Sequence, residues 1–286
     1  MTDETSTYLP PWLRAVLAVP KRLRQFLADL GGQVAFYARS LLSAPRGLRY
    51  RSEIARLVAE VSLGAGALAV VGGTVGVVVA VAFFTGGEVG LEGFKGLSLI
   101  GVESLSGFLS AFVNTREIAP LVTALALAAQ VGCGFTAQLG AMRISDEIDA
   151  LEVMAIPSLP FLVTTRIVAA LSVTLPLFAV GLLASYGATQ LLIQVVYHQS
   201  AGTYRFYFHA FLNPTDLLYA FIKVIVFSVV ITMVHCYHGY NARGGPEGVG
   251  RAVGRAIRTS IVSVIIIDML LSLLFWGTST TVRISG

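Results

Sequence analysis

Long apolar stretches separated by short polar segments dominate the chain. They cover residues 61–84, 118–142, 167–197, 217–237 and 261–276, and only the last two hold a charge, Lys223 and Asp268 respectively. A helix that crosses a bilayer needs roughly 20 predominantly apolar residues. The pattern therefore predicts an all-α membrane protein with five transmembrane helices.

The orientation of these helices follows from the basic residues. Lys and Arg gather before the first span and again between the last two, at Arg243, Arg251, Arg255 and Arg258. Cytoplasmic segments carry such an excess, so the chain crosses an even number of times between these regions. Residues 97–113 are apolar but interrupted by Glu103 and serines, and a crossing there would break this parity. We interpret them as an outer-side re-entrant segment, with the N-terminus cytoplasmic and the C-terminus outside.

The region before the first span predicts an interfacial helix. Apolar residues recur at helical spacing between residues 12 and 42, at Leu23, Leu27, Leu30, Val34, Tyr37 and Leu41. Such a helix can lie on a leaflet with its basic groups toward anionic headgroups, or it can bind a soluble partner. The chain thus divides into a cytoplasmic N-terminus with the interfacial helix, residues 1–57, and a transmembrane domain, residues 58–282.

Composition excludes several classes of protein. Of 286 residues, 55% are hydrophobic and 13% charged, whereas about a quarter are charged in soluble domains. The net charge of +4 comes from residues beside apolar segments, which argues against a nucleic-acid partner. The chain has no GxxxxGK[ST] loop and no GxSxG elbow, so we expect no enzyme, and energy must come from a partner or a gradient. His235 and His238 have no nearby carboxylate, and we expect no metal site.

Three polar residues fall at membrane positions, where charges are costly and are functional candidates. Arg116 and Glu117 stand just before Pro120. They can bind a lipid headgroup or neutralise each other at the interface. Asp268 lies inside an apolar span without neighbouring acids or bases, which favours a structural polar contact over a proton relay.

Small residues repeat every four positions in two spans. Such repeats let helix backbones approach closely. In the second span the stripe fits packing within the chain and a dimer seam equally well. The residues are Gly72 and Gly76 in the first span, and Ala124, Ala128, Gly132, Thr136 and Gly140 in the second.

Residues 143–155 predict a short amphipathic helix on the cytoplasmic side. Ile144, Ile148, Leu151 and Met154 share one face, and Ser145 is a plausible N-cap. The helix suits docking of a soluble partner, and a solvated connector is the alternative. The acids on its other faces are Asp146, Glu147, Asp149 and Glu152.

Three strings carry a family resemblance. Residues 116–125 read REIAPLVTAL, residues 137–143 read AQLGAMR, and residues 146–155 read DEIDALEVMA. They closely resemble the signature of MlaE/YrbE permeases, and the resemblance extends from about residue 50 to about 277. Gln130, Ala119 and Gln138 depart from the family's Arg, Gly and Glu, which indicates a divergent branch similar to the actinobacterial YrbE proteins encoded with Mce proteins.

The resemblance implies a permease of a lipid transporter in the inner (plasma) membrane. It implies a dimer, here a heterodimer with a second YrbE-type permease, on two ATP-binding subunits that hold ATP and Mg, with MCE-domain proteins outside. This chain itself would bind no cofactor. The lipid, of phospholipid, fatty acid, mycolic or sterol type, is not identified, and a lipid-modifying enzyme or a scaffold subunit are the alternatives.

The resemblance also assigns roles to residues. Arg116 and Glu117 match a charged pair that faces the lipid cavity. Val75, Val79 and Phe83 would line the same cavity, by position alone. The segment 143–155 would be the helix that couples to the ATPase, through Arg143, Asp146, Glu147, Asp149, Leu151, Glu152 and Met154.

Overall fold

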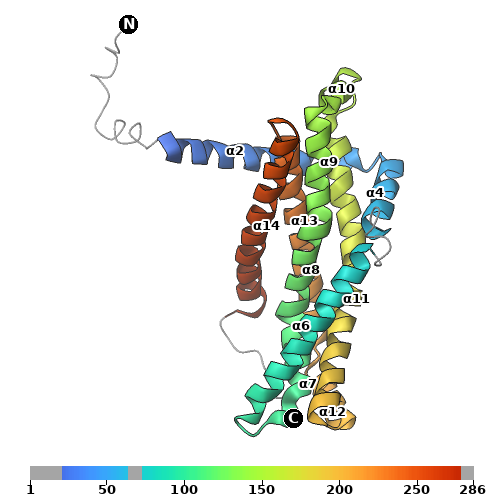
Figure 1. The fold of residues 1–286 in the computed structure, drawn as a ribbon, viewed down its shortest axis with the longest axis vertical. Coiled ribbons are helices and arrows are strands. Elements are labelled where there is room, and N and C mark those ends of the chain that lie inside the picture. Colours follow the sequence, from blue (N-terminus) through green and yellow to red (C-terminus); the bar gives the residue numbers. More distant parts are fainter. Residues whose placement is uncertain (1–20, 64–72, 278–286) are drawn as a thin grey trace, which may run out of the picture.

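The protein is a bundle of long α-helices (Figure 1). The computed structural model describes all residues except 1–20, 64–72 and 278–286, and the described part contains no strand. Within this described part, five helical stretches are long and apolar enough to cross a membrane, which confirms the predicted number. Their bounds are Gly73–Ser98, Glu103–Ile144, Leu159–Tyr197, Pro214–Tyr240 and Gly245–Trp276.

Two of these stretches are composite. The second consists of η2 (Glu103–Leu105), α7 (Ser106–Leu109), the π-helix η3 (Ser110–Ile118), α8 (Ala119–Leu127), the π-helix η4 (Ala128–Gly132) and α9 (Cys133–Ile144). The third joins the π-helix η5 (Leu159–Thr164) to α11 (Thr165–Tyr197). The remaining spans are single helices: α6 (Gly73–Ser98), α13 (Pro214–Tyr240) and α14 (Gly245–Trp276).

Residues 97–113 do not form a separate re-entrant segment, so that prediction is wrong. Residues 97 and 98 end α6, a turn passes through Gly101 at φ +70°, and Glu103 begins the second span. The serines that interrupted the apolar pattern find partners inside the protein, because Ser106 donates to Gln199 and Ser110 accepts from Asn114. The even number of crossings survives, since α6 and Glu103–Ile144 are two successive spans.

The first span lies further along the chain than predicted. Val61 belongs to α4 (Arg51–Leu63), and α6 continues past residue 84 through the Gly- and acid-rich residues 86–92. The glycines there face α11: a Cβ at Gly86 would lie 2.5 Å from the Ser185 carbonyl oxygen. They allow close helix packing, and composition alone does not distinguish this use from a loop.

Short helices cover both ends of the bundle. α12 (Ala201–Phe211) lies between the third and fourth spans, and its N-cap Ser200 accepts from Gly202 N. At the opposite end, α10 (Glu147–Val153) projects beyond the long helices, and α2 (Lys21–Leu42) runs across their direction (Figure 1). The short α3 (Ala44–Gly47) connects α2 to α4.

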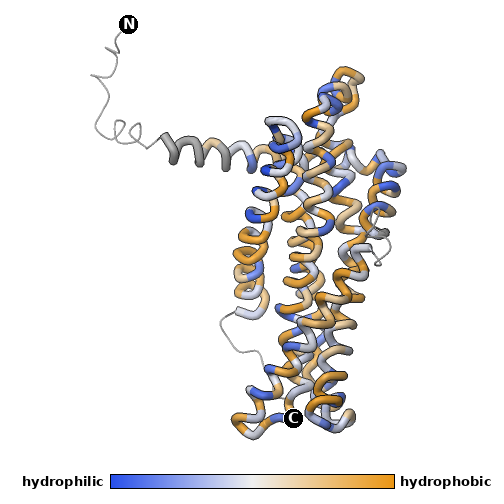
Figure 2. The backbone as a smooth tube through the Cα atoms, viewed as in Figure 1, coloured by the Kyte–Doolittle hydropathy of each residue, from blue (hydrophilic) through white to orange (hydrophobic). Residues whose placement is uncertain are grey.

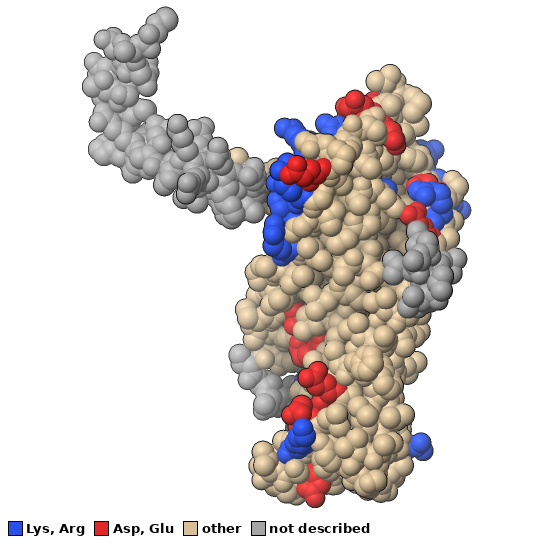
Figure 3. All heavy atoms as spheres, viewed as in Figure 1, with Lys and Arg blue, Asp and Glu red and all other residues tan. Residues whose placement is uncertain are grey.

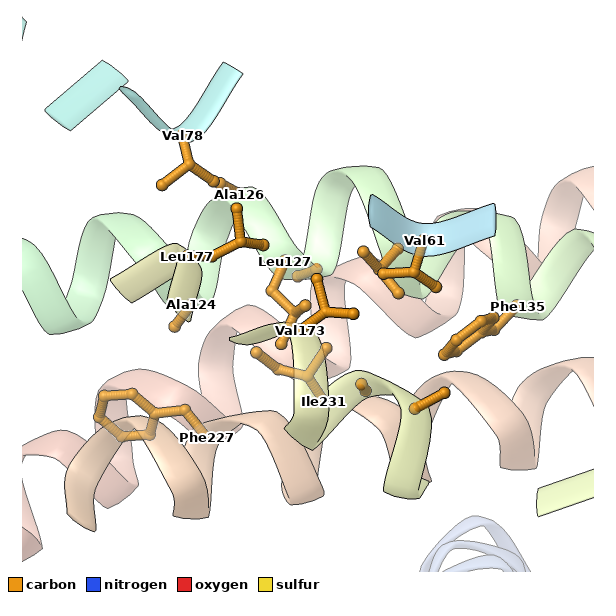
Figure 4. Close-up of a cluster of buried hydrophobic side chains, with 14 of the residues drawn as sticks. Val61, Val78, Ala124, Ala126, Leu127, Phe135, Val173, Leu177, Phe227 and Ile231 are labelled. Atoms are coloured by element: carbon orange, nitrogen blue, oxygen red, sulfur yellow. The ribbon is translucent and has the colours of Figure 1, made fainter. Parts of the chain in front are cut away.

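Three apolar clusters hold the described helices together, and the smallest of them includes Phe178 and Val224. The largest one joins α4, α6, α8, α9, α11, α13 and α14 (Figure 4), where Leu127, Val173 and Ile231 are buried. The second lies at the α10 end and includes Phe36, Leu139 and Ile148. Because lipid is as apolar as these side chains, close packing rather than exclusion from water favours their association.

Hydropathy and charge divide the bundle along its length. Hydrophobic residues follow the long helices (Figure 2), whereas Lys and Arg gather at the end that carries α10 (Figure 3). Arg251 and Arg255, both exposed, lie in the first turns of α14 at this end. The distribution agrees with the predicted cytoplasmic location of this end, which stays a prediction.

Candidate functional site

A buried ion pair lies in the half of the bundle away from α10. Arg116, in η3, donates through Nε and Nη2 to Asp216 Oδ2 at 3.0 and 2.7 Å. Its guanidinium carbon lies 3.9 Å from the ring centre of Phe112 and 4.9 Å from that of Trp276. Trp276 Nε1 donates to Asp216 Oδ1 at 2.7 Å. Asp216 therefore holds the cation and one of its aromatic neighbours together.

A second ion pair adjoins the first. Lys223 is fully buried, and its Nζ lies 2.6 Å from Asp268 Oδ1 and 3.3 Å from Glu117 Oε2. It also donates to Ser272 Oγ at 3.0 Å, and that hydroxyl donates to Glu117 Oε1 at 2.8 Å. Charges at membrane depth persist when they are paired in this way. We call Arg116, Asp216, Glu117, Lys223, Asp268, Ser272 and Trp276 the charge cluster.

The local sequence explains how the two pairs join. Pro120 has no N–H and so cannot donate the α-helical bond to the carbonyl of residue 116. Lys223 Nζ donates to that carbonyl at 2.8 Å. The π-helical turns of η3 just before it present Arg116 and Glu117 side by side, and π-bulges occur frequently at functional sites.

The charge cluster borders two hollows. One of about 460 Å³ is lined by Arg116, Glu117 and Asp268 together with apolar Met269 and Leu273. The other, of about 580 Å³, is lined by Asp216 and a set of aromatic side chains. The hollows share Phe112, Arg116 and Trp276 as lining residues. Arg116 stacked between the rings of Phe112 and Trp276, which we call the stack, therefore separates the two hollows. One hollow is apolar with charges at its wall, and the other is lined by aromatic side chains.

The cluster carries an excess of negative charge when all its groups are ionised. Three carboxylates, on Asp216, Glu117 and Asp268, face two cations, on Arg116 and Lys223. Glu117 is the most accessible of these carboxylates, with 40% of its side chain exposed. A cationic group that entered the hollow would find a carboxylate with capacity for another partner.

The cluster changes the interpretation of the predicted polar residues. Arg116 and Glu117 do not neutralise each other, because each pairs with a residue of α13. Asp268 makes a polar contact, and its partner is Lys223. Sequence reasoning did not find Asp216, Ser272 or Trp276. The one available signal was the opposite sign of Lys223 and Asp268, the single charges of their two spans.

The cavity residues predicted on the first span lie elsewhere. Val75 and Phe83 are exposed on the outside of α6, and Val79 between them is half-buried. None of the three lines either hollow of the charge cluster. A cavity bounded by this face needs a second chain opposite α6, and its role stays a prediction.

The small-residue stripe packs within the chain. A Cβ at Gly132 would lie 2.6 Å from the His235 ring, and one at Gly140 would lie 2.8 Å from Val249. Thr136 Oγ1 lies 2.8 Å from His235 Nδ1, and His235 Nε2 lies 3.2 Å from Ser260 Oγ. The stripe, Ala128 included, is buried, with α13 and α14 as its partners. We call this contact the small-residue seam. Gly76 is half-buried on α6, and Gly72 lies outside the described residues.

The predicted docking helix is α10, shorter than the expected 143–155. Ser145 ends α9 instead of capping α10, and the N-cap is Asp146 at φ +58°. Ile148 and the half-buried Leu151 pack on the core, while Val153 and Met154 are 88% and 62% exposed. Arg143 and Asp149 form an exposed ion pair, and Ser158 donates to Glu152 at 2.6 Å. The apolar face is thus divided between the core and a free surface that also carries Glu147.

Five apolar spans with paired charges inside them are the features of a polytopic membrane protein. Comparison with known protein families identifies the family to which the chain belongs. Residues 64–274 match the model of the family described as permease MlaE, and the chain belongs to this family.

Relatives share most of the described bundle. A probable ABC transporter permease protein of Rickettsia bellii is 30% identical over 207 residues, which are 70% of this chain and 77% of that protein. The chloroplastic protein TRIGALACTOSYLDIACYLGLYCEROL 1 of Arabidopsis thaliana is 30% identical over 71% of this chain and 58% of its own length. The intermembrane phospholipid transport system permease protein MlaE of Haemophilus influenzae is 26% identical over 68% and 75%, respectively. The chain is thus a multi-pass permease of the ABC transporter type.

Proposed function

We propose that this chain is the permease subunit of an ATP-driven transporter that moves phospholipid between the inner membrane and MCE-domain proteins outside. The observation that carries the proposal is the charge cluster beside a hollow with apolar walls. Ionised groups at membrane depth are costly and mark the paths of polar cargo. A phospholipid combines the two chemistries that this site offers, a charged head and apolar chains.

The geometry favours a zwitterionic head. A phosphate accepts paired hydrogen bonds from a guanidinium, as a carboxylate does, so it can replace Asp216 at Arg116. An ammonium group can pair with Glu117, the exposed carboxylate next in the chain. Replacing Asp216 at Arg116 would also loosen Trp276, since Asp216 binds both. Headgroup binding and passage between the two hollows are then linked.

Energy would reach this site from the α10 end. Two ATP-binding subunits, which hold ATP and Mg, would dock on α10, whose exposed Val153 and Met154 offer an apolar contact. Acidic Glu147 and Asp149 on the same helix provide charge for a basic partner surface. The basic end of the bundle would then face the cytoplasm. A second YrbE-type permease would complete a heterodimer and close the cavity against Val75 and Phe83.

Reconstitution of the permease with its partner subunits tests this function. We expect Glu117→Gln and Arg116→Gln to lower ATP-dependent phospholipid transfer at least tenfold while the complex still assembles. Glu92→Gln, an exposed acid outside the cluster, should transfer lipid like the parent. Normal transfer by both cluster variants would refute the cargo site. Loss of assembly without a specific loss of transfer would indicate a scaffold.

A further inference from the structure

A groove at the α10 end lies far from the charge cluster. It encloses about 1040 Å³ between α2, α3, residues 157–160 and the end of α13. Its lining includes Arg39, Arg46, Ser158, Tyr237 and Tyr240. Ligand pockets of proteins span about 300–1,000 Å³, so the groove has room for a lipid headgroup with part of its chains.

The groove has an unbalanced positive charge. Arg39 and Arg46 line it from α2 and α3, and neither forms an ion pair with any acid in the described part of the chain. Its one acid, Glu152, accepts a hydrogen bond from Ser158. Guanidinium groups bind phosphate oxygens through paired hydrogen bonds. The groove therefore suits an anionic phosphate rather than a cation or a neutral head.

The surroundings of the groove are those of a membrane interface. α2 runs across the bundle (Figure 1), and Phe36 joins it to Tyr237 and Tyr240 through ring contacts at 5.4 and 5.6 Å. Tyrosines concentrate at headgroup depth. Val34 and Leu42 of α2 are exposed, as expected of a helix that dips apolar residues into a leaflet. The arginines thus stand where phosphates of that leaflet lie.

We infer that this groove binds one anionic phospholipid of the leaflet that α2 contacts, with its phosphate on Arg39 and Arg46. The lipid is a resident ligand, since the groove shares no lining residue with the hollows of the charge cluster. Basic pockets beside membrane helices bind anionic headgroups in this manner.

Two consecutive hydrogen bonds connect the groove to α10. The Tyr240 and Ser158 hydroxyls are hydrogen-bonded at 2.8 Å, and Ser158 donates to Glu152 of α10 at 2.6 Å. A headgroup that settles against Tyr240 therefore fixes the start of the third span relative to α10. The bound lipid raises the ATPase activity of the complex. This regulatory step rests on the proposed function, whereas binding itself does not.

Lipid binding is tested on the full chain in detergent by native mass spectrometry with phosphatidylglycerol and phosphatidylcholine. We expect Arg39→Gln/Arg46→Gln to bind phosphatidylglycerol roughly 30-fold more weakly, from the contribution of two basic groups near a headgroup. Arg49→Gln/Arg51→Gln makes the same charge change on exposed residues that do not line the groove and should bind like the parent. An equal loss in both variants, or no preference for phosphatidylglycerol, overturns the site.

Regulation is tested in nanodiscs that hold the complex with its ATPase. Phosphatidylglycerol should stimulate ATP hydrolysis by the parent and by Arg49→Gln/Arg51→Gln, and not by Arg39→Gln/Arg46→Gln. If the groove variant fails to bind the ATPase while its lipid binding is intact, the groove belongs to the protein partner and the inference is wrong. Suppose that the groove variant loses lipid binding as expected, but neither the parent nor any variant transports lipid or stimulates the ATPase. The proposed function then fails, and the lipid site stands.

Discussion

Three helical stretches, Glu103–Ile144, α13 and α14, contact one another in both halves of the bundle, and the kind of contact differs between the halves. Away from α10 they are joined by the charge cluster, in which Arg116 and Lys223 pair with carboxylates of other helices. Toward α10 they are joined by the small-residue seam, in which glycines bring backbones together and His235 bonds to two neighbours. Ion pairs can exchange partners, whereas a close-packed backbone contact has one arrangement. The two halves therefore differ in what joins their helices, charge pairing in one and close packing in the other.

The largest effect should follow from breaking the charge cluster at its centre. Lys223→Met leaves Asp268 and Glu117 without their cation, and the loss of one partner of a buried pair costs about 3–5 kcal/mol. Unfolding of the detergent-solubilised protein by SDS titration measures this change. Lys95→Met, which removes the same group from an exposed pair, should matter little.

A second substitution sharpens that test. Asp268→Leu in the Lys223→Met background removes the more deeply buried of the two stranded carboxylates and should restore part of the stability, because an apolar pair can replace a buried ion pair. If Lys223→Met is no less stable than Lys95→Met, the cluster does not hold the helices together.

A somewhat smaller effect should follow from crowding the seam. A Cβ at Gly239 would lie 2.8 Å from the Thr136 carbonyl oxygen, so Gly239→Ala forces α9 and α13 apart at a cost of about 1–3 kcal/mol. Gly254→Ala on α14 meets nothing within 4 Å and should be neutral or stabilising, since Ala favours helix. Thermal unfolding of the two variants in parallel measures the contrast, and equal stabilities would mean that the seam is not close-packed.

Trp276→Phe should separate stability from function within the cluster. The variant keeps an aromatic ring near Arg116 and loses the hydrogen bond to Asp216, worth about 1 kcal/mol. If the stack controls passage between the two hollows, the rate of lipid transfer should change while the unfolding midpoint shifts by a few degrees. His235→Asn, which alters a hydrogen-bonded side chain of the seam, serves as the comparison variant, and equal transfer rates in both would contradict a role in transfer that is specific to the charge cluster.

The smallest effect on stability is expected at α10. Met154→Ser changes an exposed side chain at the end of α10, and surface substitutions usually alter stability by less than about 0.5 kcal/mol. Affinity for the ATP-binding subunit, measured by pull-down or interferometry, should nevertheless fall. Ala155→Ser, a small exposed neighbour, should bind normally. If Met154→Ser binds the ATP-binding subunit with unchanged affinity, this side of α10 is not the docking surface.

Much of the fold could be predicted from local composition. Five spans followed from apolar stretches because lipid selects long runs of apolar residues regardless of how helices pack. The errors came where polar residues are satisfied inside the protein. The serines of residues 104–110 suggested a re-entrant segment, and the first span was ended at residue 84, but helix contacts accommodate the serines and the glycines of residues 86–93.

The site was predictable only in part. Arg116, Glu117 and Asp268 were conspicuous because ionised residues stand out against an apolar background. Their partners were not predictable: Arg116 and Asp216 are 100 residues apart in sequence. Asp216 also follows Asn213 and Pro214 at a helix start, where an acidic residue is common without any distant partner.

The sequence by itself determined the membrane class, the number of spans, the short helix near residue 150 and the residues that carry charge into the membrane. Only the tertiary structure decided that Arg116 and Glu117 form ion pairs with different residues. It alone also showed that the small-residue stripe packs against helices of the same chain, and that a groove lined by Arg39 and Arg46 lies beside α10. The physical reason is that hydropathy acts on each segment alone. Partner choice depends instead on the rotation and depth of packed helices, which no single segment encodes.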